Sequence, residues 1–171
     1  LRLLHHNKVP LLSIRPDQGQ FQAELCQHSA FIEARTAEEA QCASLRQHYL
    51  AAQAMWRQAG IRDVVIKSSG MAPSFPYKTS NLDLLVRPED GDLARAILRR
   101  AGYVELRNVE ENRKYLFRLF QQGEEVAGLH VHEHVGWYAS FVDEEALWER
   151  CRVAPDDPAL TIPGDEDILL I

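Results

Sequence analysis

The 171 residues are 46% hydrophobic and 26% charged, which suits a globular domain with a sizeable core. The formal net charge of −6 argues against an extended nucleic-acid-binding surface. No apolar run reaches the roughly 20 residues that a membrane helix needs, so we expect no membrane association of that kind. The cysteines lack metal-type spacing and indicate the reduced thiols of a cytoplasmic protein: Cys26, Cys42 and Cys151.

The first 59 residues are expected to be largely helical. From Gln20 to Ala59 there is no proline or glycine, and Ala, Glu, Gln and Arg dominate, which favours helix. A break is expected near Arg35–Thr36, with Thr36 capping a second helix. One helical face of that second helix is apolar: Leu45, Tyr49, Ala52 and Trp56. Four further anchors are expected earlier: Phe21, Leu25, Phe31 and Ile32.

The stretch 61–101 predicts two buried strands and a helix. Val64–Ile66 is the first strand, and it ends on Lys67 and the small turn Ser68–Gly70. Leu82–Val86 is the second strand, with a single carboxylate, Asp83, among aliphatic residues. A helix then begins at Pro88, since proline fits the first helical position, and Gly102 ends it. The apolar face of this helix is expected to hold Leu93, Ala94, Ile97, Leu98 and Ala101.

The remaining chain predicts a hairpin and two short helices. Residues 103–106 form a short strand, and residues 113–121 and 125–134 pair around a turn at Gln122–Glu124. Asp143 caps one helix, and the acids from Asp165 begin another. Residues 152–163 contain three prolines and are expected to be irregular, with Asp156 and Asp157 in a solvated turn.

The central stretch resembles a bacterial family, the uncharacterised nucleotidyltransferases of the polymerase-beta-like nucleotidyltransferase superfamily. The similarity rests on short motifs: Ala59-Gly60-Ile61, Val64-Val65-Ile66-Lys67, Tyr77 and Leu82-Asp83-Leu84-Leu85-Val86-Arg87-Pro88-Glu89-Asp90. It implies metal-dependent transfer of a nucleoside monophosphate from an NTP to an acceptor, which the sequence does not identify. Family members continue into further helical segments, so we expect the full-length protein to extend beyond residue 171.

The chemistry implied by this resemblance depends on a pair of acids. Two acids at positions i and i+2 of a strand project from one face and can hold Mg²⁺ or Mn²⁺ against the triphosphate. Here the pair is Asn81 and Asp83, so Asp83 is the candidate catalytic acid and the metal site is degenerate. The candidate phosphate-binding residues, from their backbone amides, hydroxyls and one ammonium group, are Lys67, Ser68, Ser69 and Gly70.

The returning strand of the hairpin carries three histidines at period two, His130, His132 and His134. All three share one face, where the resemblance would place a third acid. Three such positions span about 13 Å, too far for one ion, whereas two of them with Asp83 are feasible. Imidazole nitrogens suit Zn²⁺, so His130 and His132 are candidate ligands. Glu133 could contribute instead if a bulge turned it inward.

The sequence therefore predicts an α+β fold, a nucleotidyltransferase-like mixed sheet packed by helices. Residues 1–59 form a helical segment packed on a core of residues 60–171. Three functions stay open: a nucleotidyltransferase with a degenerate metal site, an inactive nucleotide-binding module of the same fold, and an unrelated metal-binding or structural domain built on the histidine strand. Loss of two of three carboxylates favours impaired catalysis.

Overall fold

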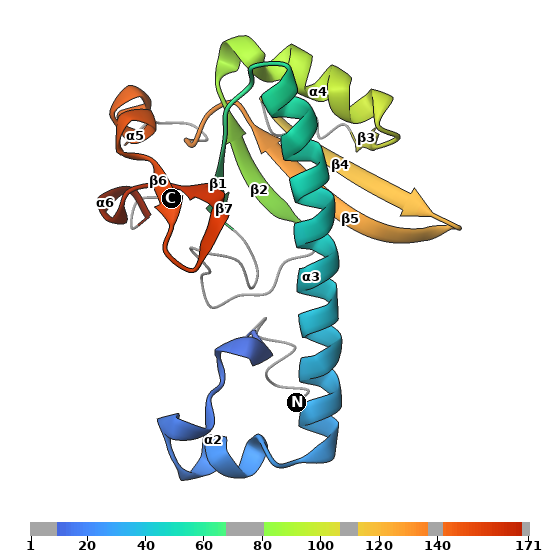
Figure 1. The fold of residues 1–171 in the computed structure, drawn as a ribbon, viewed down its shortest axis with the longest axis vertical. Coiled ribbons are helices and arrows are strands. Elements are labelled where there is room, and N and C mark those ends of the chain that lie inside the picture. The colour runs from blue at the N-terminus through green and yellow to red at the C-terminus, as the bar shows by residue number, and fades with distance from the viewer. Residues whose placement is uncertain (1–9, 68–80, 107–112, 137–141, 169–171) are drawn as a thin grey trace.

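The computed structural model describes residues 10–67, 81–106, 113–136 and 142–168. At its centre is a five-stranded mixed sheet in the order β1-β2-β5-β4-β3 (Figure 1). Strands β2 and β5 are parallel, and all other neighbours are antiparallel. The five strands are β1 (Asp63–Lys67), β2 (Leu82–Val86), β3 (Val104–Leu106), β4 (Lys114–Gln121) and β5 (Glu124–His132).

Three helices pack on the two faces of this sheet, the first helix lies apart from it, and a second, two-stranded sheet lies beside β1 (Figure 1). The helices are α2 (Gln20–Leu25), α3 (Ser29–Gln58), α4 (Gly91–Arg100), α5 (Glu144–Arg150) and α6 (Asp165–Ile168). The small sheet pairs β6 (Arg152–Ala154) with β7 (Asp157–Ile162). Short 3-10 turns occur at Leu11–Ser13, Pro16–Gln18 and Pro88–Asp90. The expected mixed sheet packed by helices is confirmed at this level.

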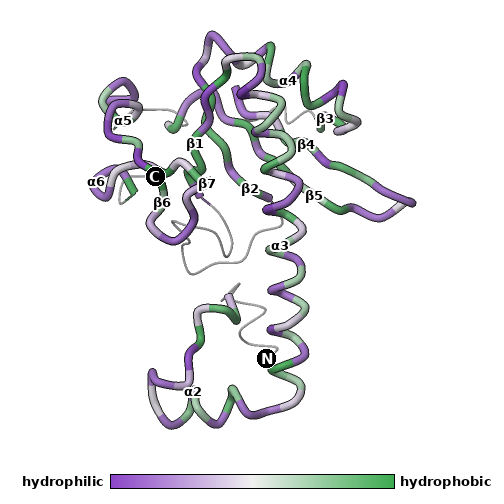
Figure 2. The backbone as a smooth tube through the Cα atoms, viewed as in Figure 1, coloured by the Kyte–Doolittle hydropathy of each residue, from purple (hydrophilic) through white to green (hydrophobic). Residues whose placement is uncertain are grey.

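One face of the large sheet forms the main core. Alternate strand residues point to this face, where α3 and α4 cover them. Figure 2 shows hydrophobic stretches of the chain gathering in the central strands. The fully buried members of this core include Val65, Leu84, Phe117, Leu129 and Val131 from the sheet, with Tyr49, Trp56, Ala94 and Leu98 from the helices. The expected apolar face of α3 is therefore confirmed.

The opposite face of the sheet is only partly apolar. Near β1, the side chains of Val64, Ile66 and Leu85 pack against Leu147 and Trp148 of α5. Helix α5 begins where expected, because the Asp143 carboxylate accepts a hydrogen bond from the Ala146 amide at 3.1 Å. Further along this face, β5 and β4 carry polar side chains, His130, His132 and Lys114, beside the aliphatic Leu116.

The expected helix break near Arg35–Thr36 is wrong. Helix α3 runs without interruption from Ser29 to Gln58, and the chain turns earlier, at Cys26–His28. An ion pair between Arg35 and Glu39 at i,i+4 spans the expected break and favours continuous helix there. Of the residues expected to anchor the first helices in the core, Phe31 is buried, whereas Phe21 and Ile32 are exposed. Among the described residues, no helix combines the length and apolarity needed to cross a bilayer.

The region expected to be irregular, residues 152–163, instead forms the β6–β7 hairpin. Proline is tolerated in β7 because a two-stranded sheet leaves one edge of each strand unpaired. Asp157 is not a solvated turn residue: Arg46 of α3 donates to its carboxylate in bidentate fashion, with distances of 2.5 and 2.8 Å. This ion pair ties the hairpin to α3.

Helix α4 begins at Gly91, after a 3-10 turn at Pro88–Asp90, and Gly102 ends it with a left-handed φ of 91°. Its buried face is narrower than expected. Ala94 and Leu98 are buried, but Leu93 and Ala101 are exposed. The hairpin strands β4 and β5 follow with boundaries close to the predicted ones.

A buried polar chain connects α3 to the start of β1. The Gln53 amide donates to the Tyr49 hydroxyl at 2.6 Å, and that hydroxyl donates to Asp63 at 2.5 Å. Burial raises the pKa of the Asp63 carboxyl, and the hydrogen bonds from Tyr49 and Gln53 offset this only in part. Ionised Asp63 is thus less favourable in the folded protein than in the unfolded chain.

This raised pKa predicts a pH dependence of stability. When folding raises the pKa of a carboxyl, its contribution to stability is fully present at pH values below the ordinary pKa near 3.8. That contribution is lost as pH rises through the pKa of the folded state. The quantity to compare is the free energy of unfolding of wild type minus that of Asp63→Asn. We expect this difference to fall as pH rises, by about 1.4 kcal/mol for each unit by which folding raises the pKa of Asp63. Urea unfolding between pH 4 and pH 7 measures this difference. Asp17→Asn, at an exposed position, is the control, and a pH-independent difference for Asp63→Asn would contradict the assignment.

Candidate metal centre

The candidate site lies on the polar part of the sheet, where β2 and β5 run side by side. Their parallel register pairs Asp83 with His130 and Leu85 with His132. Strand β2 is buried along its whole length, which explains its aliphatic sequence, and Asp83 is its only charged residue. Because paired residues of neighbouring strands share a face, Asp83, His130 and His132 point to the same side.

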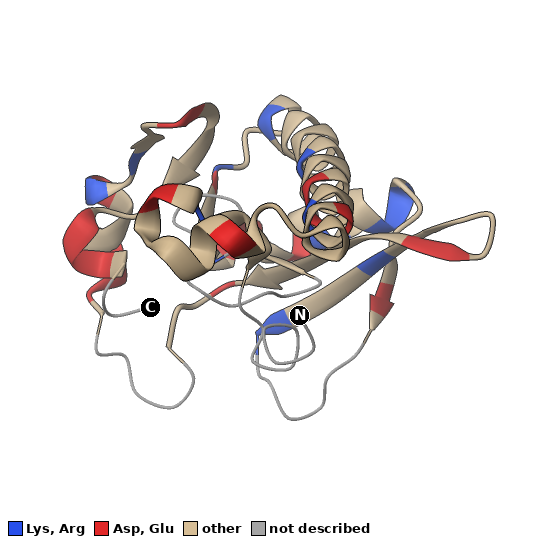
Figure 3. Ribbon diagram, turned by 90° about the horizontal axis from the view of Figure 1, so that it is seen from below, with Lys and Arg blue, Asp and Glu red and all other residues tan. Residues whose placement is uncertain are grey.

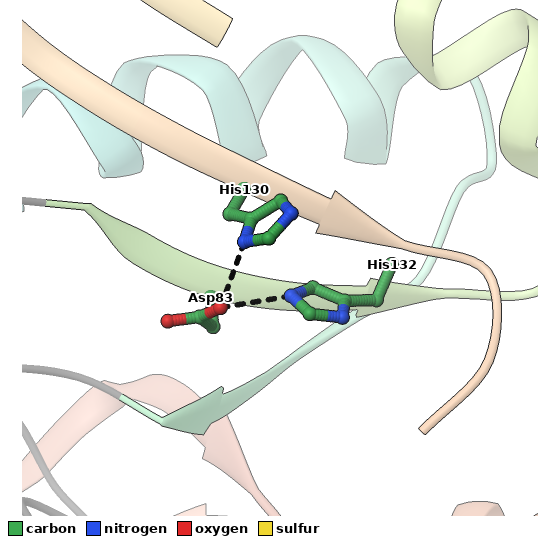
Figure 4. Close-up of side chains that lie close together, drawn as sticks. All are labelled: Asp83, His130 and His132. Atoms are coloured by element: carbon green, nitrogen blue, oxygen red, sulfur yellow. Dashed lines mark hydrogen bonds and ion pairs between the residues drawn. The ribbon is translucent and has the colours of Figure 1, made fainter. Parts of the chain in front are cut away.

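The three side chains meet at one oxygen atom. Asp83 Oδ1 lies 2.8 Å from His132 Nε2 and 3.1 Å from His130 Nδ1 (Figure 4). The two imidazole rings are 4.3 Å apart between centroids and tilted by 50°. Each residue offers one ligand atom, and these three atoms all lie within 4.8 Å of one another. A buried Asp–His–His group of this kind can hold a metal ion.

The electrostatics of Asp83 favour its ionised form. Burial by itself would raise the pKa of this carboxyl, but hydrogen bonds from His130 and His132 outweigh burial and hold the pKa well below its usual range. Asp83 therefore supplies a negative charge at neutral pH, as a carboxylate ligand must.

His132 is the most enclosed member, with 2% of its side chain exposed. Burial lowers its pKa to about 4, although the hydrogen bond to Asp83 opposes that shift. Its imidazole is thus neutral at pH 7, the form that coordinates metals. The other ring nitrogen, Nδ1, is buried and has no hydrogen-bond partner. With two imidazole nitrogens and one carboxylate oxygen, the residues fit a transition-metal ion better than Mg²⁺, which prefers oxygen ligands only.

The other residues expected at the site are only partly gathered there. Lys67 ends β1 and pairs with Asp83, so it lies at the site. Asn81 directly precedes β2, two residues before Asp83, and its role as a ligand stays a prediction. Ser68, Ser69, Gly70 and Tyr77 lie outside the described residues. The third histidine, His134, follows β5 and makes a separate contact with Glu144 at 2.9 Å, so the prediction that only two histidines meet Asp83 is consistent with the geometry.

The alternative in which a bulge turns Glu133 towards the histidines does not occur. Glu133 is buried, and Arg113 donates to its carboxylate at 3.2 Å. This carboxylate lies against Gly91 at the start of α4, where an added Cβ would overlap it. Glu133 therefore compensates Arg113 and the positive end of a helix instead of joining the metal ligands.

No sequence pattern marks Lys114 as a site residue, yet the structure places it beside the site. It pairs with His132 across β4 and β5. The register of a regular hairpin, extended from the Gln121–Glu124 pair, would place Lys114 opposite Val131 and on the core face. An irregularity near Leu119–Phe120, with Val126 as the extra residue of β5, shifts the register and turns Lys114 to the histidine face. A bulge within a strand leaves no clear local sequence signal.

The fold and this group of side chains define a mixed α/β protein with a candidate metal centre. No family model, characterised protein or solved structure matches the chain.

Proposed function

We propose that the chain is a metal-dependent nucleotidyltransferase-like protein whose metal ligands are Asp83, His130 and His132. The observation that carries the proposal is the convergence of two imidazole nitrogens on one carboxylate oxygen, at 2.8 and 3.1 Å. These distances are close to the ligand–ligand separations of a tetrahedral ion with bonds of about 2.0–2.1 Å. All three ligand atoms lie within 4.8 Å of one another, so an ion would bind between them after the side chains adjust their separations to the roughly 3.3 Å of that geometry.

The strand arrangement is compatible with the resemblance in the sequence. The acid-bearing strand β2 has β1 on one side, ending on Lys67, and β5 on the other, carrying His130 and His132. In this superfamily the strand beside the acid pair would supply the third acid. Here two imidazoles stand in that place, so the proposed ion is Zn²⁺, which nitrogen ligands suit, with Mn²⁺ as the second candidate.

The proposed reaction is a displacement at the α-phosphorus of an NTP. An acceptor oxygen forms a bond to that phosphorus, and the bond from phosphorus to the oxygen bridging to the β-phosphate breaks. Pyrophosphate leaves, and the acceptor proton passes to water. A bound divalent ion would offset the negative charge on the phosphate oxygens. The chain itself would contribute the ligands and the ammonium group of Lys67.

A second candidate is a nucleotide-binding protein without turnover. The observation that favours it is the single carboxylate of the ligand group, Asp83, because Asn81 cannot neutralise a second positive charge. Imidazole ligands are neutral, so an ion held here keeps more of its charge than one held by three acids. Such an ion can retain phosphate tightly, which suits binding more than product release.

The test has two stages. Thermal unfolding of wild type is followed in Zn²⁺, Mn²⁺ or Mg²⁺, each with and without every NTP, and pyrophosphate release is then measured for the stabilising pairs. Stabilisation by Zn²⁺ or Mn²⁺ that increases with NTP supports metal-dependent nucleotide binding, and pyrophosphate release would select the transferase over the binding protein. His134→Ala is the matched control, since that histidine contacts Glu144 and not Asp83. No response of wild type to any metal would refute the proposal.

A further inference from the structure

Two lysines lie on the same sheet face as the candidate metal ligands, one on each side. In β1, Lys67 pairs with Asp83, and in β4, Lys114 pairs with His132. Residues paired across neighbouring strands share a face, so the strand order β1-β2-β5-β4 places a lysine at each flank of the three ligands.

Each lysine owes this orientation to an irregularity in its ladder. In β1, the pairs Val65–Leu84 and Lys67–Asp83 leave Ile66 as an extra residue. Without that extra residue, Lys67 would pair with Leu82 and point into the core. The second irregularity, with Val126 as the extra residue of β5, acts in the same way on Lys114. Bulges commonly change the direction of side chains next to functional sites. Here two independent bulges turn two lysine side chains to the sheet face that carries the candidate metal ligands.

The spacing of the two lysines suits an anion between them. At roughly 4.8 Å per strand and 3.3 Å per residue, their Cα atoms lie about 14 Å apart across the strands and about 7 Å apart along them, which gives a separation of about 16 Å. Lysine has a flexible four-carbon stem, so both ammonium groups can approach a group lying above the metal ligands. The charge of Lys114 already acts at the site, because it contributes to lowering the pKa of His132.

The charges around the candidate metal ligands favour an anionic ligand. Asp83 contributes one negative charge, whereas a divalent ion and two ammonium groups contribute four positive charges. The excess of positive charge would be costly without an anionic ligand, and it contrasts with the formal net charge of −6 of the chain. Figure 3 shows acidic as well as basic positions distributed over the helices and strands of the chain. A phosphate chain carries enough negative charge to balance the excess.

We propose that Lys114, together with Lys67, holds the phosphate chain of the ligand over the metal ligands, with one lysine at each flank. This inference rests on the proposed function and adds a phosphate-positioning residue from β4. The contact would be made to phosphate oxygens, so tripolyphosphate and a nucleoside triphosphate should depend on Lys114 to a similar extent.

The experiment measures binding by titration calorimetry in excess Mn²⁺. The two probes are tripolyphosphate and the α,β-methylene analogue of ATP, which cannot release pyrophosphate. Lys114→Gln should weaken both about tenfold, the effect of losing one charge-assisted contact, and Lys114→Arg should restore most of the affinity. Arg118→Gln is the matched control, because Arg118 lies four residues along β4 on the same face and contacts Glu125.

The metal is measured separately, so that failure of the metal centre and failure of the lysine pair are distinguishable. Lys114→Gln should bind Mn²⁺ as tightly as wild type or more tightly, because a like charge is removed. Wild-type affinity of Lys114→Gln for both probes would overturn the role of Lys114 while leaving the metal centre intact. If wild type bound neither Mn²⁺ nor Zn²⁺, the proposed function would fail, and the same titrations in EDTA would decide whether the lysines hold phosphate alone. If Lys114→Gln lost tenfold in affinity for the ATP analogue but kept its affinity for tripolyphosphate, Lys114 would contact the nucleoside and the proposed phosphate contact would be overturned.

Discussion

Asp83→Ala is expected to weaken metal binding by more than about 100-fold, beyond the range seen when only an outer partner of a ligand is removed. Asp83 supplies the only negative charge of the three ligands, and both imidazoles converge on its Oδ1 atom. Its removal leaves His130 and His132 without the oxygen that orients them. Competition with a chromophoric chelator measures the affinity for Zn²⁺ and Mn²⁺.

The conservative change Asp83→Asn separates charge from geometry. Asparagine keeps one oxygen in place but removes the charge, so we expect an affinity between those of wild type and Asp83→Ala. His134→Ala should leave the affinity unchanged, because its partner is Glu144. An Asp83→Ala affinity within threefold of wild type would mean that the ion binds elsewhere.

Trp56→Ala is expected to lower the free energy of unfolding by about 3–5 kcal/mol, the usual cost of truncating a large core aromatic residue. Trp56 is fully buried near the end of α3, and its indole Nε1 donates to the Ala94 carbonyl of α4 at 3.1 Å. The substitution thus leaves both a cavity and a buried carbonyl without its donor. Urea unfolding followed by circular dichroism measures the change.

Trp56→Phe is the matched variant, because it retains much of the apolar volume and removes only the indole N–H. We expect it to cost about 1–3 kcal/mol, mainly from the unsatisfied carbonyl of Ala94. If Trp56→Ala cost less than about 1 kcal/mol, helix α3 would not pack on the sheet as described. Equal costs for the two variants would assign the whole effect to the hydrogen bond.

The elements of the fold could be predicted where local sequence rules decide them. The buried strand around Asp83, the hairpin around Gly123 and the helix capped by Asp143 all have local signals. The errors lie where distant contacts decide. Thr36 has the character of a helix cap, yet the chain stays helical through it, and residues 152–163 become a hairpin that packs beside β1 and is tied to α3 through Asp157.

The site could be predicted only in part for the same reason. Period two in β5 puts His130 and His132 on one face, and it limits how many histidines can reach one ion. The pairing of β2 with β5, 49 residues apart from Asp83 to His132, is a tertiary fact. Bulges shift the register by one residue, and a one-residue shift reverses the face of every side chain beyond it. That is why Lys114 could not be placed at the site from its sequence.

The length of α3 has a consequence for how the protein opens. This helix has 30 residues, about 45 Å at 1.5 Å per residue, and its core contacts with the sheet involve the C-terminal part from Leu45 to Trp56. Amide protons around Trp56 should exchange with solvent only when the whole domain unfolds, whereas those near Ser29 can exchange through fraying of the end. A single unbroken helix would then show a gradient of protection along its axis, steepest where it leaves the sheet.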